Sequence, residues 1–126
     1  MDFKNFKKNY DEIIDNSCDL LEDNSFAAIV VGEVRDKKGI YHNFVPETIN
    51  AFLKAGLKYY NEAILITMVG SLPLRCGKAF TSSRKLGKTH QNLLVFVKGD
   101  PAIATEKCGL CEFANPEEFK DEDVEI

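Results

Sequence analysis

The sequence has 126 residues and a formal net charge of −4, a length that fits a single domain. Hydrophobic residues make up 44% and charged residues 29%, which is typical of a globular protein. No apolar run approaches the roughly 20 residues of a membrane-spanning helix, which excludes a membrane protein. The first residues lack the apolar core of a secretory signal, so we expect a cytoplasmic protein with reduced cysteines.

The first half of the chain predicts a helix, a strand and a second helix. Residues 3 to 22 are predicted to be an amphipathic helix, because apolar side chains recur at steps of three and four. Residues 26 to 34 form an apolar run with β-branched residues, the pattern of a strand buried on both faces. The second helix is predicted over residues 47 to 55, since Pro46 favours a helix start and Gly56 a helix end.

Two more strands are predicted in the second half, over residues 62 to 69 and 92 to 98, with no clear helix between them. A strand, helix and strand in succession predict a parallel crossover, so the first two strands should be parallel. The last strand should return antiparallel beside its predecessor, at the sheet edge. The expected class is α/β, with a partial Rossmann-like sheet in a domain of residues 1–101. Residues 102–126 are expected to form an acidic, loosely ordered tail.

A basic segment follows the second predicted strand. Residues 71 to 96 contain no acidic side chain, and the carboxyl ends of parallel strands are where open α/β folds bind ligands. The segment predicts a mobile loop that contacts phosphates, and therefore DNA as a partner. A solvated surface loop without a ligand is the alternative. The candidate nucleic-acid-binding residues are Arg75, Lys78, Arg84, Lys85 and Lys88.

Other polar residues fall near the same edge. Glu33, Arg35 and Asp36 follow the first strand and are candidates for ligand contact, although Arg35 and Asp36 could equally cap the strand as an ion pair. His90 is interpreted as structural rather than catalytic. Phe80 is the aromatic residue best placed to stack on a base.

A possible half-site for zinc lies near the C-terminus, where Cys108 and Cys111 have a C-x-x-C spacing. One such pair without a second is weak support for a metal. We therefore predict no metal site and interpret these residues as ordinary thiols.

Four sequence blocks carry a resemblance: VVGEVRDKKG, YNEAIL, VGSLP and RKLGKTHQNLLVFVKGD. With them, residues 10 to 101 resemble the C-terminal portion of phage-type DNA methyltransferases that modify exocyclic amino groups of adenine or cytosine. The resemblance implies a seven-stranded Rossmann-like sheet that ends in a parallel strand followed by an antiparallel one. It also implies S-adenosylmethionine as cofactor, with the three strands of this chain as the fifth, sixth and seventh.

Two motifs that such an enzyme needs are missing. One is the Gly-rich loop that holds S-adenosylmethionine, and the other is an Asp-Pro-Pro-Tyr type motif that holds the target amino group. No catalytic or cofactor-binding residue is therefore assigned. We expect a C-terminal part that needs a complementary N-terminal half, or that self-associates through the exposed edge of its first strand. The alternative is a noncatalytic nucleic-acid-binding protein or a degenerate remnant of the fold.

Overall fold

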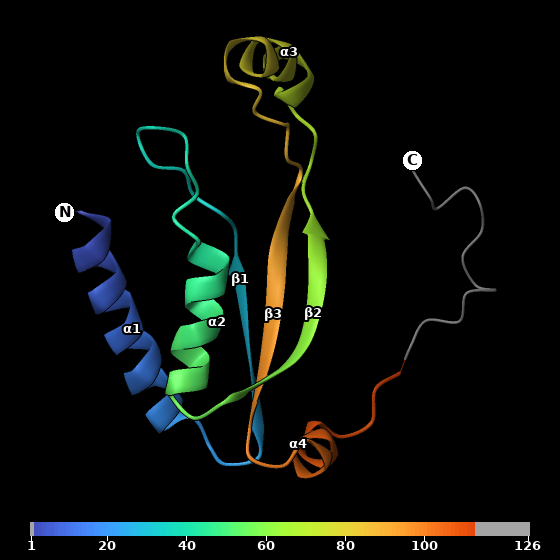
Figure 1. Ribbon diagram of the computed structural model, residues 1–126. Coiled ribbons are helices and arrows are strands. Elements are labelled where there is room, and N and C mark those ends of the chain that lie inside the picture. Colours follow the sequence, from blue (N-terminus) through green and yellow to red (C-terminus); the bar gives the residue numbers. More distant parts are fainter. Residues whose placement is uncertain (1, 113–126) are drawn as a thin grey trace.

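The computed structural model describes residues 2–112, which form a three-stranded sheet with four helices (Figure 1). The α/β class expected from the sequence is confirmed. In chain order the elements are α1 (Phe3–Leu20), β1 (Ser25–Val31), α2 (Phe44–Lys54), β2 (Lys58–Ile66), α3 (Leu72–Ser83), β3 (His90–Lys98) and α4 (Pro101–Cys108).

The strand order is β1-β3-β2, and β3 pairs antiparallel with both neighbours. It follows that β1 and β2 run in the same direction, as expected, but they do not pair. The predicted parallel pairing is therefore wrong, and so is the edge position of the last strand. Burial gives a physical reason: β3 supplies the deeply buried Leu94, Phe96 and Val97, whereas β2 carries Asn61 and Glu62 and is exposed throughout. A strand that is apolar on both faces buries the most apolar surface when it occupies the central position.

Helix α1 is fixed at both ends. The Asp2 carboxylate accepts a hydrogen bond from the Asn5 backbone N–H at 2.8 Å, which caps the start of the helix. At the other end, the Lys98 ammonium donates to the carbonyl oxygens of Cys18 and Leu21 at 2.7 and 2.8 Å. A cation is favourable there, because the helix dipole places negative charge at its C-terminus. This contact ties α1 to the end of β3.

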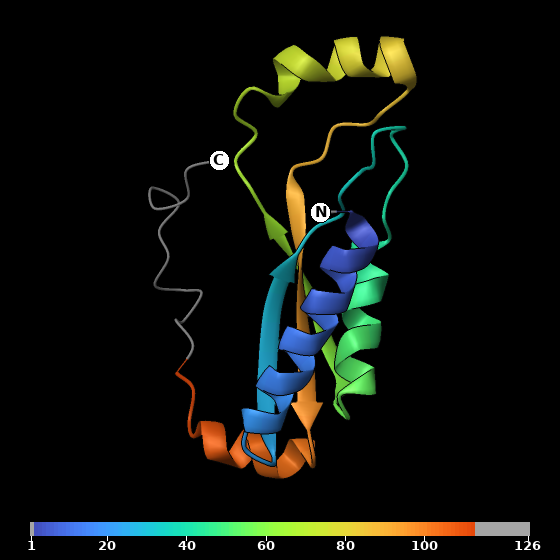
Figure 2. The same cartoon turned by 90° about the vertical axis from the view of Figure 1, so that its left-hand side faces the viewer.

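The main core lies between the sheet and α2. The rings of Phe52 and Phe96 stack with their centroids 4.2 Å apart, and Phe96 is fully buried. Thr48 on α2 is also fully buried, but its hydroxyl donates to the Phe44 carbonyl and lies 3.0 Å from the Tyr10 hydroxyl. Helices α1 and α2 therefore cover the same face of the sheet, as Figure 2 shows.

Helix α4 extends the packed part of the chain beyond the expected boundary at residue 101. The Asp100 carboxylate accepts from the Ala102 backbone N–H at 2.8 Å, and Pro101 opens the helix. Ala104 is buried against β1 and β3. The first seven residues of the expected tail thus belong to a helix, and residues 113–126 lie outside the described part.

Candidate nucleic-acid interface

Within the basic segment expected to be a loop, residues Leu72–Ser83 form the helix α3 instead. Pro73 stands in its first turn, where the missing backbone N–H costs nothing. Leu74, Arg75, Lys78 and Ala79 favour a helix by intrinsic propensity. None of the residues of α3 is buried, so the helix has no side that packs in the core. A core-facing side is what gives a helix a regular apolar pattern, and its lack explains why the sequence pattern did not indicate this helix.

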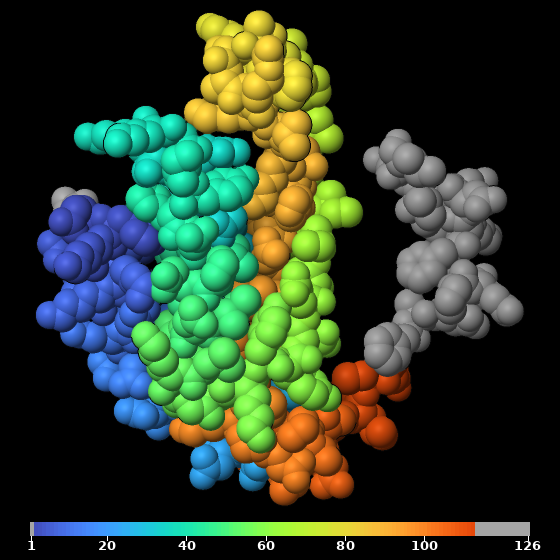
Figure 3. Space-filling view, in the orientation of Figure 1, coloured from blue at the N-terminus to red at the C-terminus, as the bar shows by residue number. Residues whose placement is uncertain are grey.

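Helix α3 stands apart from the body of the protein, at the end where β1 and β2 terminate (Figures 1 and 3). Two segments, residues 67–71 and 84–89, connect it to the sheet. The second segment passes close to the helix: a Cβ on Gly87 would lie 3.2 Å from Leu72 Cδ2. The side chains of α3 that face away from this segment are open to solvent.

Three of the five predicted cations belong to α3 or its C-terminal cap. Arg75 and Lys78 are exposed and lie about one turn apart, and Arg75 Nε donates to Ser71 Oγ at 3.2 Å. Arg84 adopts a left-handed conformation with φ of 58° and donates to the carbonyl oxygens of Phe80 and Thr81. Its guanidinium lies 5.2 Å from the centroid of the Phe80 ring. These contacts hold a positive charge at the C-terminus of the helix, which is the negative end of the helix dipole.

The other two cations, Lys85 and Lys88, are half-buried and turn back toward the sheet. A Cβ on Gly39 would lie 3.1 Å from Lys85 Cε, and a Cβ on Gly32 would lie 3.9 Å from Lys88 Nζ. The predicted binding residues are therefore split into an outer group on α3 and an inner group beside the turn that follows β1.

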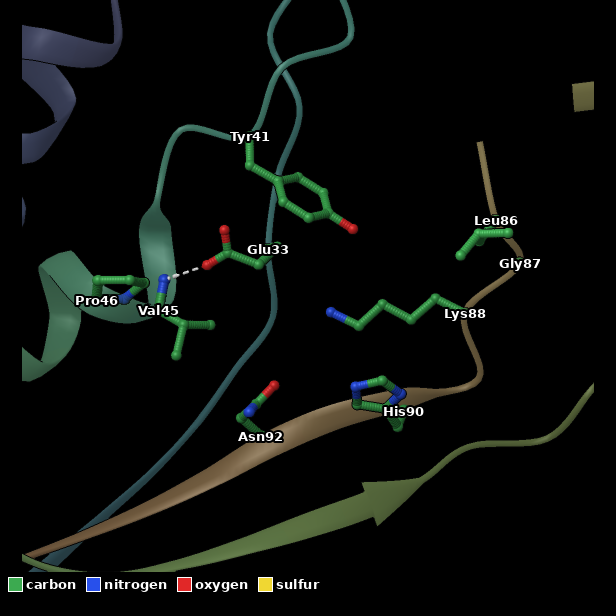
Figure 4. A pocket seen from close by; sticks show the side chains of 9 residues that line it. All are labelled: Glu33, Tyr41, Val45, Pro46, Leu86, Gly87, Lys88, His90 and Asn92. Carbon is green, nitrogen blue, oxygen red and sulfur yellow. Dashed lines mark hydrogen bonds between the residues drawn. The ribbon is translucent and has the colours of Figure 1, made fainter. Parts of the chain in front are cut away.

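A pocket of about 480 Å³ lies beneath α3, between this turn and the segment that enters β3 (Figure 4). One Glu33 carboxylate oxygen accepts from the Val45 backbone N–H at 2.6 Å, at the start of α2. Figure 4 shows the Tyr41 ring and the Lys88 side chain projecting into the pocket from opposite sides. The pocket is lined by Glu33, Tyr41, Val45, Pro46, Leu86, Gly87, Lys88, His90 and Asn92.

These lining residues offer a carboxylate, an ammonium, an imidazole, an amide and one aromatic ring. They can form hydrogen bonds with a small ligand that has several polar groups. Tyr41 and Asn92 were missed by the sequence reasoning. Asn92 could have been found from the sequence, because it is a polar residue in a predicted strand and the residues that follow it are apolar. His90, interpreted as structural, also lines the pocket.

Of the three residues predicted at this edge, only Glu33 lines the pocket. Arg35 donates to the Gly39 carbonyl oxygen at 2.8 Å, and its guanidinium lies 4.3 Å from the centroid of the Tyr41 ring. Asp36 accepts from the backbone N–H groups of Lys38 and Ile40 at 2.8 and 2.9 Å. Arg35 and Asp36 thus stabilise the turn through separate contacts, and the interpretation as a mutual ion pair is wrong.

Neither a metal centre nor a membrane segment is found in residues 2–112. No group of three or more His, Cys, Asp or Glu side chains there could hold a metal ion. Cys108 and Cys111 are exposed free thiols. None of the described helices has the length and apolar character required to cross a bilayer.

Comparisons with protein-family models, curated proteins and solved structures gave no match to this chain.

Proposed function

We propose that this chain is the C-terminal part of a cytoplasmic, S-adenosylmethionine-dependent DNA methyltransferase that modifies an amino group of adenine or cytosine. In this proposal the chain supplies a DNA-contacting helix, and a complementary half supplies the cofactor site. The observation that carries it is α3, an exposed helix without any acidic side chain that stands above a polar pocket. The four sequence blocks described above add the methyltransferase assignment.

The strand directions support a partial Rossmann-like sheet. The methyltransferase sheet implied by the resemblance ends in a parallel strand followed by an antiparallel one. Here β1 and β2 run in the same direction and β3 runs against both. Because β3 occupies the centre, β1 lies at one edge of the sheet described for residues 2–112. We place the complementary half, or a second copy that pairs edge to edge, along this strand.

The cations divide the DNA contact into two parts. Arg75, Lys78 and Arg84 would contact backbone phosphates along α3, since arginine and lysine contacts with phosphate supply most sequence-independent affinity. Lys85 and Lys88 would contact the strand nearest the pocket. Phe80 is only partly free to stack on a base, because the Arg84 guanidinium covers one side of its ring.

A second candidate function is DNA binding without methyl transfer. The observation that favours it is the lack of both the Gly-rich loop and the Asp-Pro-Pro-Tyr type motif in this sequence. Under this alternative the chain is a binding module or a remnant of the fold, and α3 keeps the same role.

The DNA contact is tested by the affinity for a short duplex, measured by fluorescence anisotropy at several salt concentrations. If all five cations contact phosphates, raising salt from about 50 to about 200 mM should weaken binding about 500-fold. The double substitution Arg84→Ala with Lys85→Ala should weaken binding and reduce the magnitude of the logarithmic salt slope by about 2. The matched control is Lys4→Ala with Lys8→Ala, which removes two exposed charges from α1. Equal effects of the two double variants would contradict a contact through α3.

Methyl transfer distinguishes the two candidates. The chain is mixed with labelled S-adenosylmethionine and DNA, first alone and then with a chain that carries the two missing motifs. The proposal expects incorporation of label only in the mixture, and its loss with the Arg84 and Lys85 double variant. Normal DNA affinity without incorporation in the mixture would favour the noncatalytic module.

A further inference from the structure

The face of the sheet opposite α1 and α2, here called the rear face, is mainly apolar, and its one charged side chain in the three strands is Lys58, at the end near α4. The register places it on alternate residues, because directly paired residues of antiparallel strands share a face. Phe96 and Leu94 point toward α2, so their neighbours point to the rear, where the rings of Phe26 and Tyr60 stack 5.3 Å apart. The apolar members of the rear face are Phe26, Ala28, Val30, Tyr60, Ala63, Leu65, Leu93, Val95 and Val97, and its polar members are Lys58, Asn61 and Gln91.

Among residues 2–112, α4 covers only one end of this rear face (Figure 2). Close to α4, Val97 is 2% exposed and Ala104 on the helix is 1% exposed. Elsewhere the apolar side chains are open, with Val30 at 48%, Tyr60 at 51% and Leu65 at 47% exposure. A contiguous apolar face of this kind marks an interaction surface.

The apolar character of the rear face limits what can cover it. Residues 113–126 include seven charged side chains among 14, and placing them on an apolar sheet would remove those charges from water at a large cost. The same cost disfavours α3, which is cationic. The contact surface of the occupant must therefore be mainly apolar and flat. The rear face of a second copy meets both requirements, because a two-fold contact brings identical patches together.

We propose that two copies of this chain associate through their rear faces, as two stacked sheets. Face-to-face sheets pack about 10 Å apart, which equals the diameter of a helix, so α4 fits at the border of the same gap. Strands of seven, nine and nine residues give a planar area of about 400 Å² per copy, or about 800 Å² for the pair. Side-chain relief and α4 add to this figure, which places the contact at the low end of specific interfaces. The expected dimer is accordingly weak, with a dissociation constant in the micromolar range.

This inference does not depend on the proposed function, because it needs neither DNA nor a cofactor. It also differs from association along the β1 edge, which would pair backbones and leave the rear face open. Leu65 and Ile66 separate the two modes: they are neighbours at the end of β2, but Leu65 pairs with Gln91 on the rear side and Ile66 with His90 on the α2 side.

The test is sedimentation equilibrium of the whole chain over about 1 to 200 µM, a range that brackets micromolar association. The wild type should change from monomer to dimer within this range. Leu65→Lys should shift the dissociation constant upward at least tenfold, whereas the matched control Ile66→Lys, at a side chain that is 80% exposed, should leave it unchanged. Circular dichroism verifies that both variants fold.

A second measurement locates the contact without any substitution. Methyl NMR signals of Leu93 and Val95 should shift with protein concentration, and that of Ile64, on the opposite face, should not. A wild type that stays monomeric throughout the concentration range would overturn the proposal. So would a dimer that Leu65→Lys leaves intact, since that dimer would use the β1 edge or another surface.

Discussion

Asp36 illustrates how one carboxylate can organise a turn. Its Oδ1 atom accepts from two backbone N–H groups, those of Lys38 and Ile40, which lie two and four residues along the chain. These bonds favour the charged form, so the pKa of Asp36 lies below its ordinary value of 3.8, with the bond from Ile40 as the main cause. The turn places Tyr41 at the pocket, so Asp36 helps to position Tyr41 by holding the backbone of the turn.

The lowered pKa predicts how the turn responds to acid. A carboxylate whose pKa is depressed in the folded state stabilises that state above its ordinary pKa, and the stabilisation is lost as pH falls through the folded value. We therefore expect the Asp36 Cγ signal in NMR to titrate below 3.8 and the Ile40 amide signal to move with it. Asp36→Asn keeps the oxygen acceptor but should abolish this movement of the Ile40 signal. Titration of Asp36 at or above 3.8 would contradict the geometry of the turn.

The sequence placed polar residues at this edge but did not resolve their roles. Glu33, Arg35 and Asp36 are close together in the chain, yet only Glu33 reaches the pocket. The reason is local: the chain reverses at Gly39, with φ of 87°, so Arg35 faces the Gly39 carbonyl and the Tyr41 ring. Charge and position along a strand predict exposure, whereas the direction of each side chain depends on turn hydrogen bonds between residues up to six positions apart.

Helices α3 and α4 show the limits of periodicity as a signal. The amphipathic α1 and the well-bounded α2 were both predicted, because each buries an apolar side against the sheet. Helix α3 has no fully buried residue, and α4 is only eight residues long. The strand order β1-β3-β2 was missed for another reason, since the pairing of Ser25 with Lys98 joins residues far apart in sequence. Such pairing is decided by the burial of the whole sheet rather than by any local pattern.

Gly77 offers a test of α3 as a helix rather than a loop. Its φ is not positive, and a Cβ at this position would meet nothing within 4 Å. Gly77→Ala should therefore stabilise α3 by about 1 kcal/mol, because glycine loses more backbone freedom in a helix than alanine does. We expect a stronger helical signal in circular dichroism. We also expect tighter DNA binding, because a more stable α3 loses less conformational freedom when it binds DNA.

The matched control for Gly77 is Gly70→Ala. Gly70 precedes the helix with φ of 53°, a conformation that strains alanine, so this variant should not stabilise the helix. If α3 were an unstructured loop, both variants would leave the helical signal unchanged. That result would restore the loop predicted from the sequence.

The molecule carries two exposed surfaces with opposite chemistry. One is the cationic helix α3 at the end of the sheet, and the other is the mainly apolar rear face along its side. Because the two lie on different parts of the fold, one copy can use both at once. A dimer through the rear face would carry two α3 helices, and on a duplex that reaches both of them the second contact would benefit from a high effective concentration.

Salt should separate the two surfaces in one experiment. Binding to phosphates releases counterions, so the DNA affinity of the wild type must fall steeply between about 50 and about 200 mM salt. Contact between the apolar rear faces releases few counterions, so the dimer dissociation constant from sedimentation should change less than about twofold over the same range. On a duplex long enough for two copies, Leu65→Lys should bind more weakly than the wild type, because the variant does not dimerise. On a short duplex that holds one copy, the two proteins should bind with the same affinity. A dimer that dissociates with salt would point to charged contacts instead, such as α3 of one copy on acidic residues of the other.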